Sequence, residues 1–154
     1  MPTKTILIID DDANHRDMLR AVLEEAGFAV IAIGDAAQAF ARLAQDIDLV
    51  LLDLVMPGAA MDGFTFLSKA RQRAELIHTP VIVLSGLGDS VIDAMDPATA
   101  NALHITSVVS KPVDLSVLLS NVHAALETQD RPSSASPRVT RQHHRHLRYA
   151  SQGP

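Results

Sequence analysis

Charged and hydroxyl side chains directly follow four of the short apolar runs in this sequence. They are Asp10, Asp11 and Asp12 after the first run, Asp53 after the third, Ser85 at the end of the fourth and Lys111 after the fifth. Clustered carboxylates repel one another unless a cation lies among them, and hard divalent ions such as Mg²⁺ prefer oxygen ligands. The hydroxyl of Ser85 and the ammonium of Lys111 suit phosphoryl oxygens instead. The set is therefore what a phosphate-accepting carboxylate requires.

The elements that must position these residues alternate between two periodicities. Short apolar runs predict strands at Ile6–Ile9, Phe28–Ile33, Leu49–Leu52, Val81–Leu84 and Ile105–Val109. Apolar stripes predict helices marked by Met18–Ala26, Phe40–Ala44, Leu67–Ile77, Val91–Met95 and Leu115–Leu126. This alternation predicts an α/β domain with a parallel sheet. Ligands bind at the carboxyl ends of such strands, so the acidic, hydroxyl and ammonium groups are expected at one edge.

Individual residues near the predicted helix ends have simpler structural interpretations. Gly27 is expected to stop the first helix, and Asp96-Pro97 to interrupt or restart the fourth, because Pro fits a first helical turn. Asp12 is expected to be a helix N-cap and not a ligand. Asp62-Gly63 is interpreted structurally as a turn only. The Met and Phe residues are expected in the core.

Composition limits the class of protein. The 154 residues are 47% hydrophobic and contain no Cys, which excludes a disulfide scaffold, a thiolate zinc site and a Cys nucleophile. No apolar run approaches the ~18 residues of a membrane span, and the N-terminus lacks the features of a secretory signal. The chain is therefore expected to be cytoplasmic.

Charge divides the chain into two parts. The net charge is −5, but five of the 13 Lys and Arg residues, and only one of the 18 acidic residues, lie in 130–154. The body is thus strongly acidic and would repel DNA. Residues 1–129 are predicted to be the folded domain, and 130–154 a basic flexible tail or linker. The His and Arg residues of the tail have no Asp or Cys beside them that would complete a metal site.

Five motifs in order resemble the receiver domain of bacterial two-component response regulators, of the chemotaxis-receiver type. They are Ile-Leu-Ile-Ile-Asp10-Asp11, Leu-Val-Leu-Leu-Asp53-Leu-Val-Met-Pro-Gly, Met-Asp62-Gly63-Phe, Val-Ile-Val-Leu-Ser85-Gly and Val-Val-Ser-Lys111-Pro112. The resemblance covers roughly residues 4–128. The segments after Ser85 and before Lys111 are similar to receivers fused to EAL-type cyclic-di-GMP phosphodiesterases.

The resemblance implies a fold and a site. The fold would be flavodoxin-like, a doubly wound five-stranded parallel sheet of order 2-1-3-4-5 with five helices and a commonly cis Lys111-Pro112 bond. Asp53 would accept a phosphoryl group from a phosphohistidine. Mg²⁺ would be held by Asp10, Asp11, Asp53 and the backbone carbonyl of Val55, while Ser85 and Lys111 would contact the phosphoryl group.

Partners and output also follow from the resemblance. The donor would be a sensor histidine kinase or a histidine phosphotransfer protein, and the chain would catalyse only its own phosphorylation and dephosphorylation. Output would use the face of the fourth helix, fifth strand and fifth helix, which can also pair two copies; the downstream partner is not identified. Val55 and Leu87 would overhang the approach of water, and both are apolar, which predicts slow self-dephosphorylation.

The sequence departs from the family at three places. The segment 58–61 contains two residues more than is usual in the family, and the span from Ser85 to Lys111 is about four residues longer. The position of the usual switch aromatic, three before the lysine, is Val108, which has no ring to move between buried and exposed rotamers. The usual coupling between the hydroxyl and the aromatic therefore cannot operate in its common form.

Two other interpretations compete with a single-domain receiver. A haloacid-dehalogenase-type phosphatase also uses an Asp nucleophile, a hydroxyl and a Lys, but Asp10-x-Asp12 continues as Ala-Asn. That family also needs a final acidic pair after the Lys, and Asp114 has no acidic neighbour that would complete such a pair. A transcription factor needs a DNA-binding domain, which the residues after the last helix are too few to form unless the chain is a fragment of a larger regulator.

Overall fold

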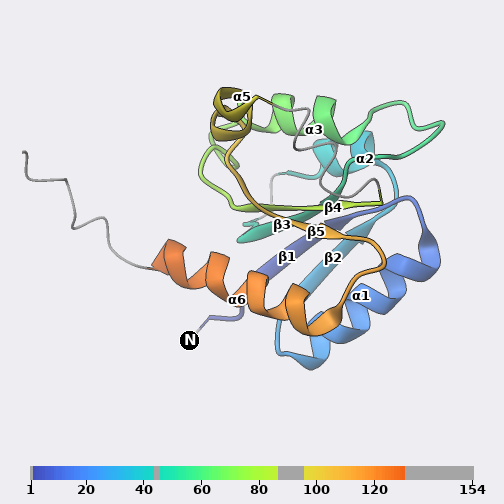
Figure 1. Cartoon of the computed structure of the whole chain (residues 1–154), viewed down its shortest axis with the longest axis vertical. Helices are drawn as coiled ribbons and strands as arrows, with labels where there is room; N and C mark the ends of the chain where they lie inside the picture. Colours follow the sequence, from blue (N-terminus) through green and yellow to red (C-terminus); the bar gives the residue numbers. More distant parts are fainter. Residues whose placement is uncertain (1, 44–45, 87–95, 131–154) are drawn as a thin grey trace, which may run out of the picture.

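The computed structural model describes residues 2–43, 46–86 and 96–130, in which five strands alternate with five helices (Figure 1). The strands are β1 (Thr5–Ile9), β2 (Ala29–Ile33), β3 (Leu49–Asp53), β4 (Val81–Ser85) and β5 (Ile105–Ser110). The helices are α1 (Ala13–Glu25), α2 (Ala36–Ala41), α3 (Gly63–Ala70), α5 (Pro97–Ala102) and α6 (Leu115–Asp130). The predicted alternation is confirmed.

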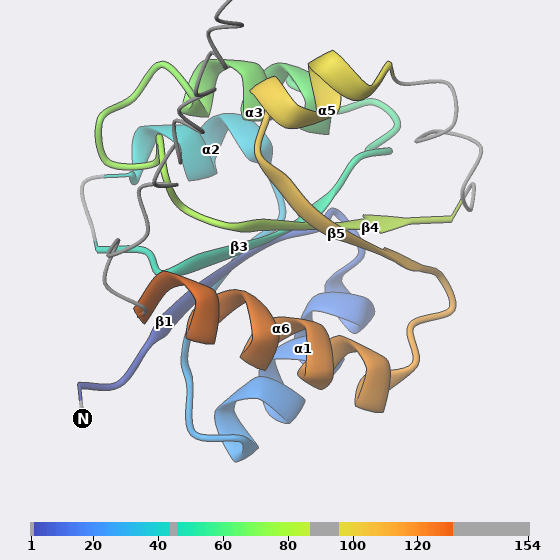
Figure 2. The ribbon, with the colours of Figure 1, turned by 60° about the vertical axis from the view of Figure 1, so that its left-hand side comes forward.

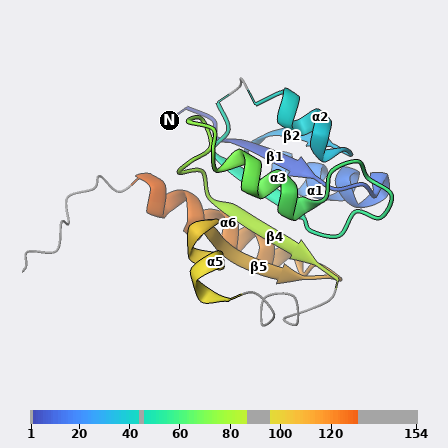
Figure 3. The same cartoon turned by 90° about the horizontal axis from the view of Figure 1, so that it is seen from above.

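The strands form one parallel sheet of order β2-β1-β3-β4-β5. Figure 3 shows the arrows of β1, β4 and β5 pointing the same way. The order reverses between β1 and β3, which is the switch point where ligands bind in doubly wound sheets. The predicted flavodoxin-like topology is therefore confirmed.

Helices cover both faces of the sheet. Figure 2 shows α1 and α6 on one face, with α2, α3 and α5 on the other. Side chains alternate along each strand, so Leu7 and Ile9 pack toward α2 and α3, whereas Ile6 and Ile8 pack toward α1 and α6. Because both faces are covered, the central strands β1, β3 and β4 are apolar over four consecutive residues.

Polar caps and a glycine set several helix ends. The Asp12 side chain accepts a hydrogen bond from the backbone N–H of His15, which confirms it as the N-cap of α1. Gly27 follows α1 with φ +97, a left-handed conformation that favours glycine. Asp96 caps α5 and Pro97 occupies its first turn, so the predicted restart of a helix at this point is confirmed.

The predicted helical stripe from Leu67 to Ile77 is wrong beyond Ala70. Helix α3 ends there, and successive turns follow up to Thr79. Ala74 is exposed and Ile77 is 42% exposed, so neither extends the buried face. In these turns, the side chain of Arg71 donates hydrogen bonds to the backbone carbonyls of Leu76 and Thr79.

The expectation that every Met and Phe lies in the core is also wrong. Phe66 and Met56 are buried, but Met18 is 39% exposed on α1 and Phe64 is 37% exposed on α3. Phe64 lies in the first turn of α3, and Met18 precedes the inward-facing Leu19 by one residue. Apolar identity alone therefore did not indicate burial at these two positions.

Some predictions fall outside the described residues. These concern the helical stripe Val91–Met95, Leu87 and the basic tail over 131–154. The division of the chain at residue 129 also stays a prediction. Among the described residues, no helix has the length and apolar character that a membrane span requires.

Candidate active site at the carboxyl edge of the sheet

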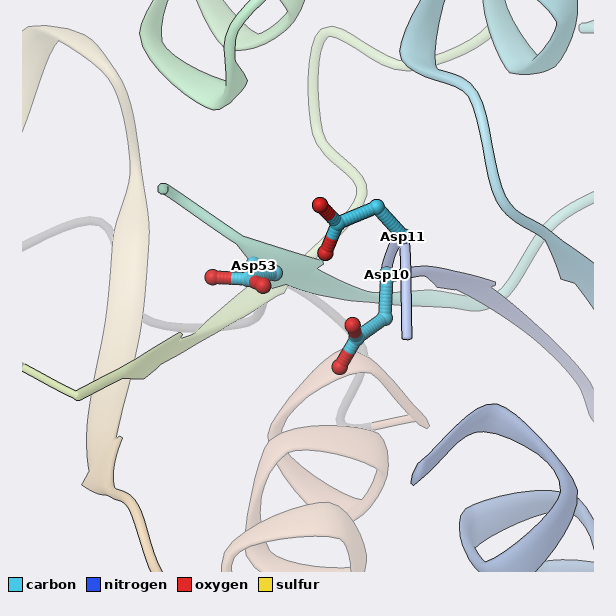
Figure 4. A group of neighbouring side chains, drawn as sticks. All are labelled: Asp10, Asp11 and Asp53. Atoms are coloured by element: carbon cyan, nitrogen blue, oxygen red, sulfur yellow. The ribbon is translucent and has the colours of Figure 1, made fainter. Parts of the chain in front are cut away.

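Three carboxylates meet where β1 and β3 end (Figure 4). Ile9 pairs with Leu52 in the parallel ladder, so the next residues, Asp10 and Asp53, lie side by side. With Asp11, they offer carboxylate oxygens that all lie within 4.8 Å of one another. Asp10 and Asp53 are buried and Asp11 is exposed. The predicted gathering of these residues is confirmed.

Lys111 brings a cation to the same point from β5. Its backbone N–H donates to the carbonyl of Ser85 at 2.8 Å, which aligns the ends of β4 and β5. Its Nζ lies 3.0 Å from Oδ2 of Asp53 and 3.4 Å from Oδ2 of Asp10. The Lys111-Pro112 peptide bond is cis, as the resemblance implied. One ammonium thus bridges two buried carboxylates.

The two buried carboxylates respond differently to this environment. Burial raises the pKa of Asp53, and the hydrogen bond and charge of Lys111 offset this rise only in part. Burial also acts to raise the pKa of Asp10, but hydrogen bonds from His15 and the Asp12 backbone, with the Lys111 charge, outweigh it and lower the pKa. Burial opposes the charge of Lys111, yet the two carboxylates raise its pKa. Asp53 is therefore the less stabilised anion.

Ser85 lies at the same edge and is fully buried. It is the last residue of β4, it pairs with Ser110, and it follows Leu84, the partner of Asp53 in the ladder. The strand order therefore places Ser85 between the ends of β3 and β5. All the predicted site residues lie on one edge, while their roles remain predictions.

The loop after β3 packs closely against Asp53. The backbone N–H of Val55 donates to Oδ1 of Asp53 at 3.1 Å. Asp62 caps α3, and a Cβ added at Gly63 would lie 2.7 Å from the carbonyl oxygen of Asp53 and from Cα of Leu54. The interpretation of Asp62-Gly63 as only a turn is thus wrong. The pair starts a helix whose first residue contacts the backbone of the site.

Sequence reasoning missed two residues that hold Asp10. Nδ1 of His15 contacts Oδ2 of Asp10 in a short hydrogen bond, and Nη1 of Arg16 donates to the Asp10 carbonyl at 2.8 Å. A signal was available, because both residues lie in the first turn of a helix that starts beside the acidic pair. The apolar stripe of α1 predicts only the face that Leu19 and Leu23 bury.

The donor set fits a hard divalent cation. Three carboxylates converge within 4.8 Å, two of them buried, and Mg²⁺ takes carboxylate oxygens with water and phosphate oxygens. Ionised carboxylates this close repel one another, and a bound divalent cation would relieve this repulsion. The set provides only oxygen ligands, which suits Mg²⁺ better than a thiophilic metal.

Comparison with known proteins identifies the family. The family model described as response regulator receiver domain matches residues 6–123. The chain belongs to the response regulator receiver family. It is 32% identical over 150 residues to the "DNA-binding dual master transcriptional regulator RpaA" of Synechocystis, an alignment that covers 97% of this chain and 56% of the relative.

Solved structures agree with the receiver fold. The receiver domain of an HD domain-containing protein from Pseudomonas fluorescens has a TM-score of 0.72 at 29% identity, covering 83% of this chain and 98% of that one. The chemotaxis response regulator CheY4 of Vibrio cholerae has a TM-score of 0.70 at 24% identity, covering 81% and 100%, and shows the fold alone.

Membership in the receiver family rules out one of the two earlier alternatives. A haloacid-dehalogenase-type phosphatase is excluded, and the geometry agrees because Asp12 caps a helix. The chain is a receiver domain of the two-component type, and it spans about half the length of the curated relatives it matches. The expected closeness to EAL-associated receivers stays a prediction.

Proposed function

We propose that this receiver accepts a phosphoryl group on Asp53 from a phosphohistidine, with Mg²⁺ at the acidic cluster. The observation that carries the proposal is the position of Asp53. It is buried at the switch point of the sheet, its Oδ2 lies 3.0 Å from the Lys111 ammonium, and Asp10 and Asp11 lie within 4.8 Å. Burial also raises the pKa of Asp53, and perturbed pKa values of this kind are common at functional sites.

The transfer exchanges one bond for another. A carboxylate oxygen of ionised Asp53 attacks phosphorus and forms an O–P bond, while the P–N bond of the donor breaks in line and the imidazole leaves with the bonding electron pair. Lys111 would move its hydrogen bonds from the carboxylates to the phosphoryl oxygens. The Ser85 hydroxyl would bind another phosphoryl oxygen from the neighbouring strand end.

Asp10, Asp11, Asp53 and the backbone carbonyl of Val55 are the proposed ligands of Mg²⁺. The ion would supply positive charge that neutralises the carboxylates and the phosphoryl oxygens in the transition state. The fit rests on the oxygen-only donor set and on the burial of Asp10 and Asp53. A cation here would leave Lys111 available for the phosphoryl group.

The partners are proposed from the family. A sensor histidine kinase or a histidine phosphotransfer protein would donate the phosphoryl group, and the chain would act on no other substrate. Output would use the surface of α5, β5 and α6, through a protein partner or a second copy. Half-buried Val108 packs against the core on the α2–α3 face, so any response of β5 would move an aliphatic side chain.

The length of the relatives supports a second proposal about the whole protein. RpaA is named as DNA-binding, and this chain covers 56% of it. A receiver of this kind can therefore be one part of a larger regulator, in which α6 would lead toward an output domain.

A phosphorylation assay tests the assignment of Asp53. Incubation with acetyl phosphate and Mg²⁺, followed by intact mass, should show one added phosphoryl group in wild type and none in Asp53→Asn. Asp12→Asn is the matched control, because it makes the same chemical change beside the acidic pair and Asn still caps a helix. Undiminished labelling of Asp53→Asn would refute the assignment.

A further inference from the structure

Asp10 is anchored at each of its polar atoms. Its N–H donates to a strand carbonyl, its own carbonyl accepts from a guanidinium, and each carboxylate oxygen accepts at least one hydrogen bond. The partners are Ile33 O at 3.2 Å, Arg16 Nη1 at 2.8 Å, the Asp12 N–H on Oδ1 at 2.9 Å, and His15 Nδ1 with Lys111 Nζ on Oδ2. This density of contacts fixes the orientation of the carboxylate.

The other two carboxylates are held less firmly. Asp53 accepts from the Val55 N–H and from Lys111. Asp11 is exposed, and within the described part of the chain no group donates a hydrogen bond to its carboxylate. A cation that enters this cluster therefore meets one fixed ligand, Asp10, and one adjustable ligand, Asp11.

The position of His15 follows from the cap of α1. The His15 backbone N–H donates to Oδ1 of Asp12 at 3.1 Å, so His15 lies in the capped first turn of α1. The ring then contacts Asp10, and the His15 side chain is only 16% exposed. An ionised carboxylate only accepts hydrogen bonds, so Nδ1 carries the proton of this contact.

The neighbouring residue, Arg16, holds the backbone of Asp10. Arg16 lies against Gly34, where an added Cβ would come within 2.6 Å of Nη1. The absence of a side chain at Gly34 thus lets the guanidinium reach the Asp10 carbonyl. Consecutive residues of α1 therefore hold the two ends of Asp10, His15 the carboxylate and Arg16 the backbone.

We propose that His15 is a positioning residue that orients the Asp10 carboxylate for a divalent cation and so sets the cation affinity of the site. Partners that orient metal ligands in this way typically change metal affinity by about 10- to 100-fold when they are removed. The inference rests on the proposed function, because it assumes that Asp10 is a ligand.

The test compares two substitutions of His15. His15→Leu removes the donor, whereas His15→Asn keeps an N–H near the position of Nδ1. Titration calorimetry with Mg²⁺, at one fixed pH, should give a Kd about tenfold higher for His15→Leu than for wild type and largely restored for His15→Asn. His78→Leu, an exposed His at the opposite edge, is the control and should leave the Kd unchanged.

A second measurement separates positioning from a general structural role. At saturating Mg²⁺, the initial rate of labelling of His15→Leu by acetyl phosphate should return to the wild-type rate, because only cation affinity is affected. An unchanged Kd in His15→Leu, or a labelling defect that saturating Mg²⁺ does not correct, would overturn the role of His15 and leave the proposed function intact. If wild type itself binds no Mg²⁺, both the inference and the proposed cation site fail.

Discussion

Charged side chains at the two edges of the sheet have opposite kinds of partners. At the amino edge, the guanidinium of Arg71 donates hydrogen bonds to four backbone carbonyls, and no carboxylate among the described residues pairs with it. These acceptors are Leu103 at 2.7 Å, Thr79 at 2.8 Å, His104 at 3.1 Å and Leu76. At the carboxyl edge, two buried carboxylates share one lysine, and a third lies within 4.8 Å.

The amino edge is expected to stabilise the fold, whereas the carboxyl edge is expected to serve the proposed function. The carbonyls around Arg71 belong to the turns that precede β4 and β5. This one side chain therefore connects the end of α3 with the turns before β4 and with the turn before β5. Its donors are satisfied, and burial of a charge is tolerated when such hydrogen bonds replace water. The carboxylates repel one another, and the proposed cation would relieve this repulsion. Substitutions at the two edges should therefore affect different measurements.

The largest expected effect is at the amino edge. Arg71→Met keeps the apolar stem but leaves four carbonyls without their charged donor, and should lower the free energy of unfolding by about 3 kcal/mol. Labelling of Asp53 should stay at the wild-type level wherever the variant is folded. Urea unfolding measures the first effect, and intact mass the second.

Arg20→Met is the matched control for Arg71→Met. Arg20 forms an exposed ion pair with Glu24, which is worth less than about 1 kcal/mol. Similar losses of stability in the two variants would contradict the special role of the amino edge.

The sequence predicted the features that depend on periodicity. Uninterrupted apolar runs predicted strands covered on both faces, and the alternation with helices predicted a parallel sheet. A parallel sheet brings the residues after each strand to one edge, so the sequence alone predicted that Asp10, Asp53 and Lys111 lie close together. Asp12 and Asp96 were also predictable, because caps depend on local chemistry.

Features that depend on what lies opposite a residue were missed. Arg71 falls within an apolar stripe that predicted a helix, and its carbonyl partners near Leu103 and His104 are more than 30 residues away. Gly63 was interpreted as a turn, because its contact with the backbone of Asp53 exists only after α3 packs on β3. Local patterns contain no information about such tertiary approaches.

The next largest effect is expected at Gly63, at the carboxyl edge. Gly63→Ala places a Cβ 2.7 Å from the backbone of Asp53 and Leu54, which cannot move as a side chain can, and should lower stability by about 2 kcal/mol. Labelling of Asp53 should fall as well, because the strain falls on the phosphoacceptor itself. Gly86→Ala is the control, since an added Cβ there has no atom within 4 Å.

Opposite stability effects are expected from two Asp→Asn substitutions in cation-free protein. Asp53→Asn removes an anion whose pKa is raised by burial and should raise the free energy of unfolding at neutral pH. Asp10→Asn removes an anion whose pKa is lowered by its hydrogen bonds, so it should lower that free energy. Each change should be on the order of 1 kcal/mol, the usual coupling between neighbouring groups.

The pH dependence distinguishes these two effects. Ionised Asp53 destabilises the fold, so the advantage of Asp53→Asn should grow as pH rises from the usual 3.8 through the raised pKa, and vanish below 3.8. Ionised Asp10 stabilises the fold, so its contribution should be full above 3.8 and disappear as pH falls through its lowered pKa. Changes of the same sign in both variants would contradict the assigned environments.

The smallest expected effect concerns the lifetime of phosphorylated Asp53. Hydrolysis needs a water in line with the O–P bond, and the side chain of Val55, 44% exposed just after the phosphoacceptor, cannot orient one. Val55→Asn adds groups that can hydrogen-bond a water and should speed decay about threefold, which corresponds to ~0.6 kcal/mol in the barrier. Ile77→Asn makes a comparable change at the amino edge, where Ile77 is 42% exposed, and should leave decay unchanged. The decay is followed by intact mass after removal of acetyl phosphate. Wild-type decay rates in both variants would contradict the protection by Val55. Faster decay in both variants would contradict the separation of the two edges.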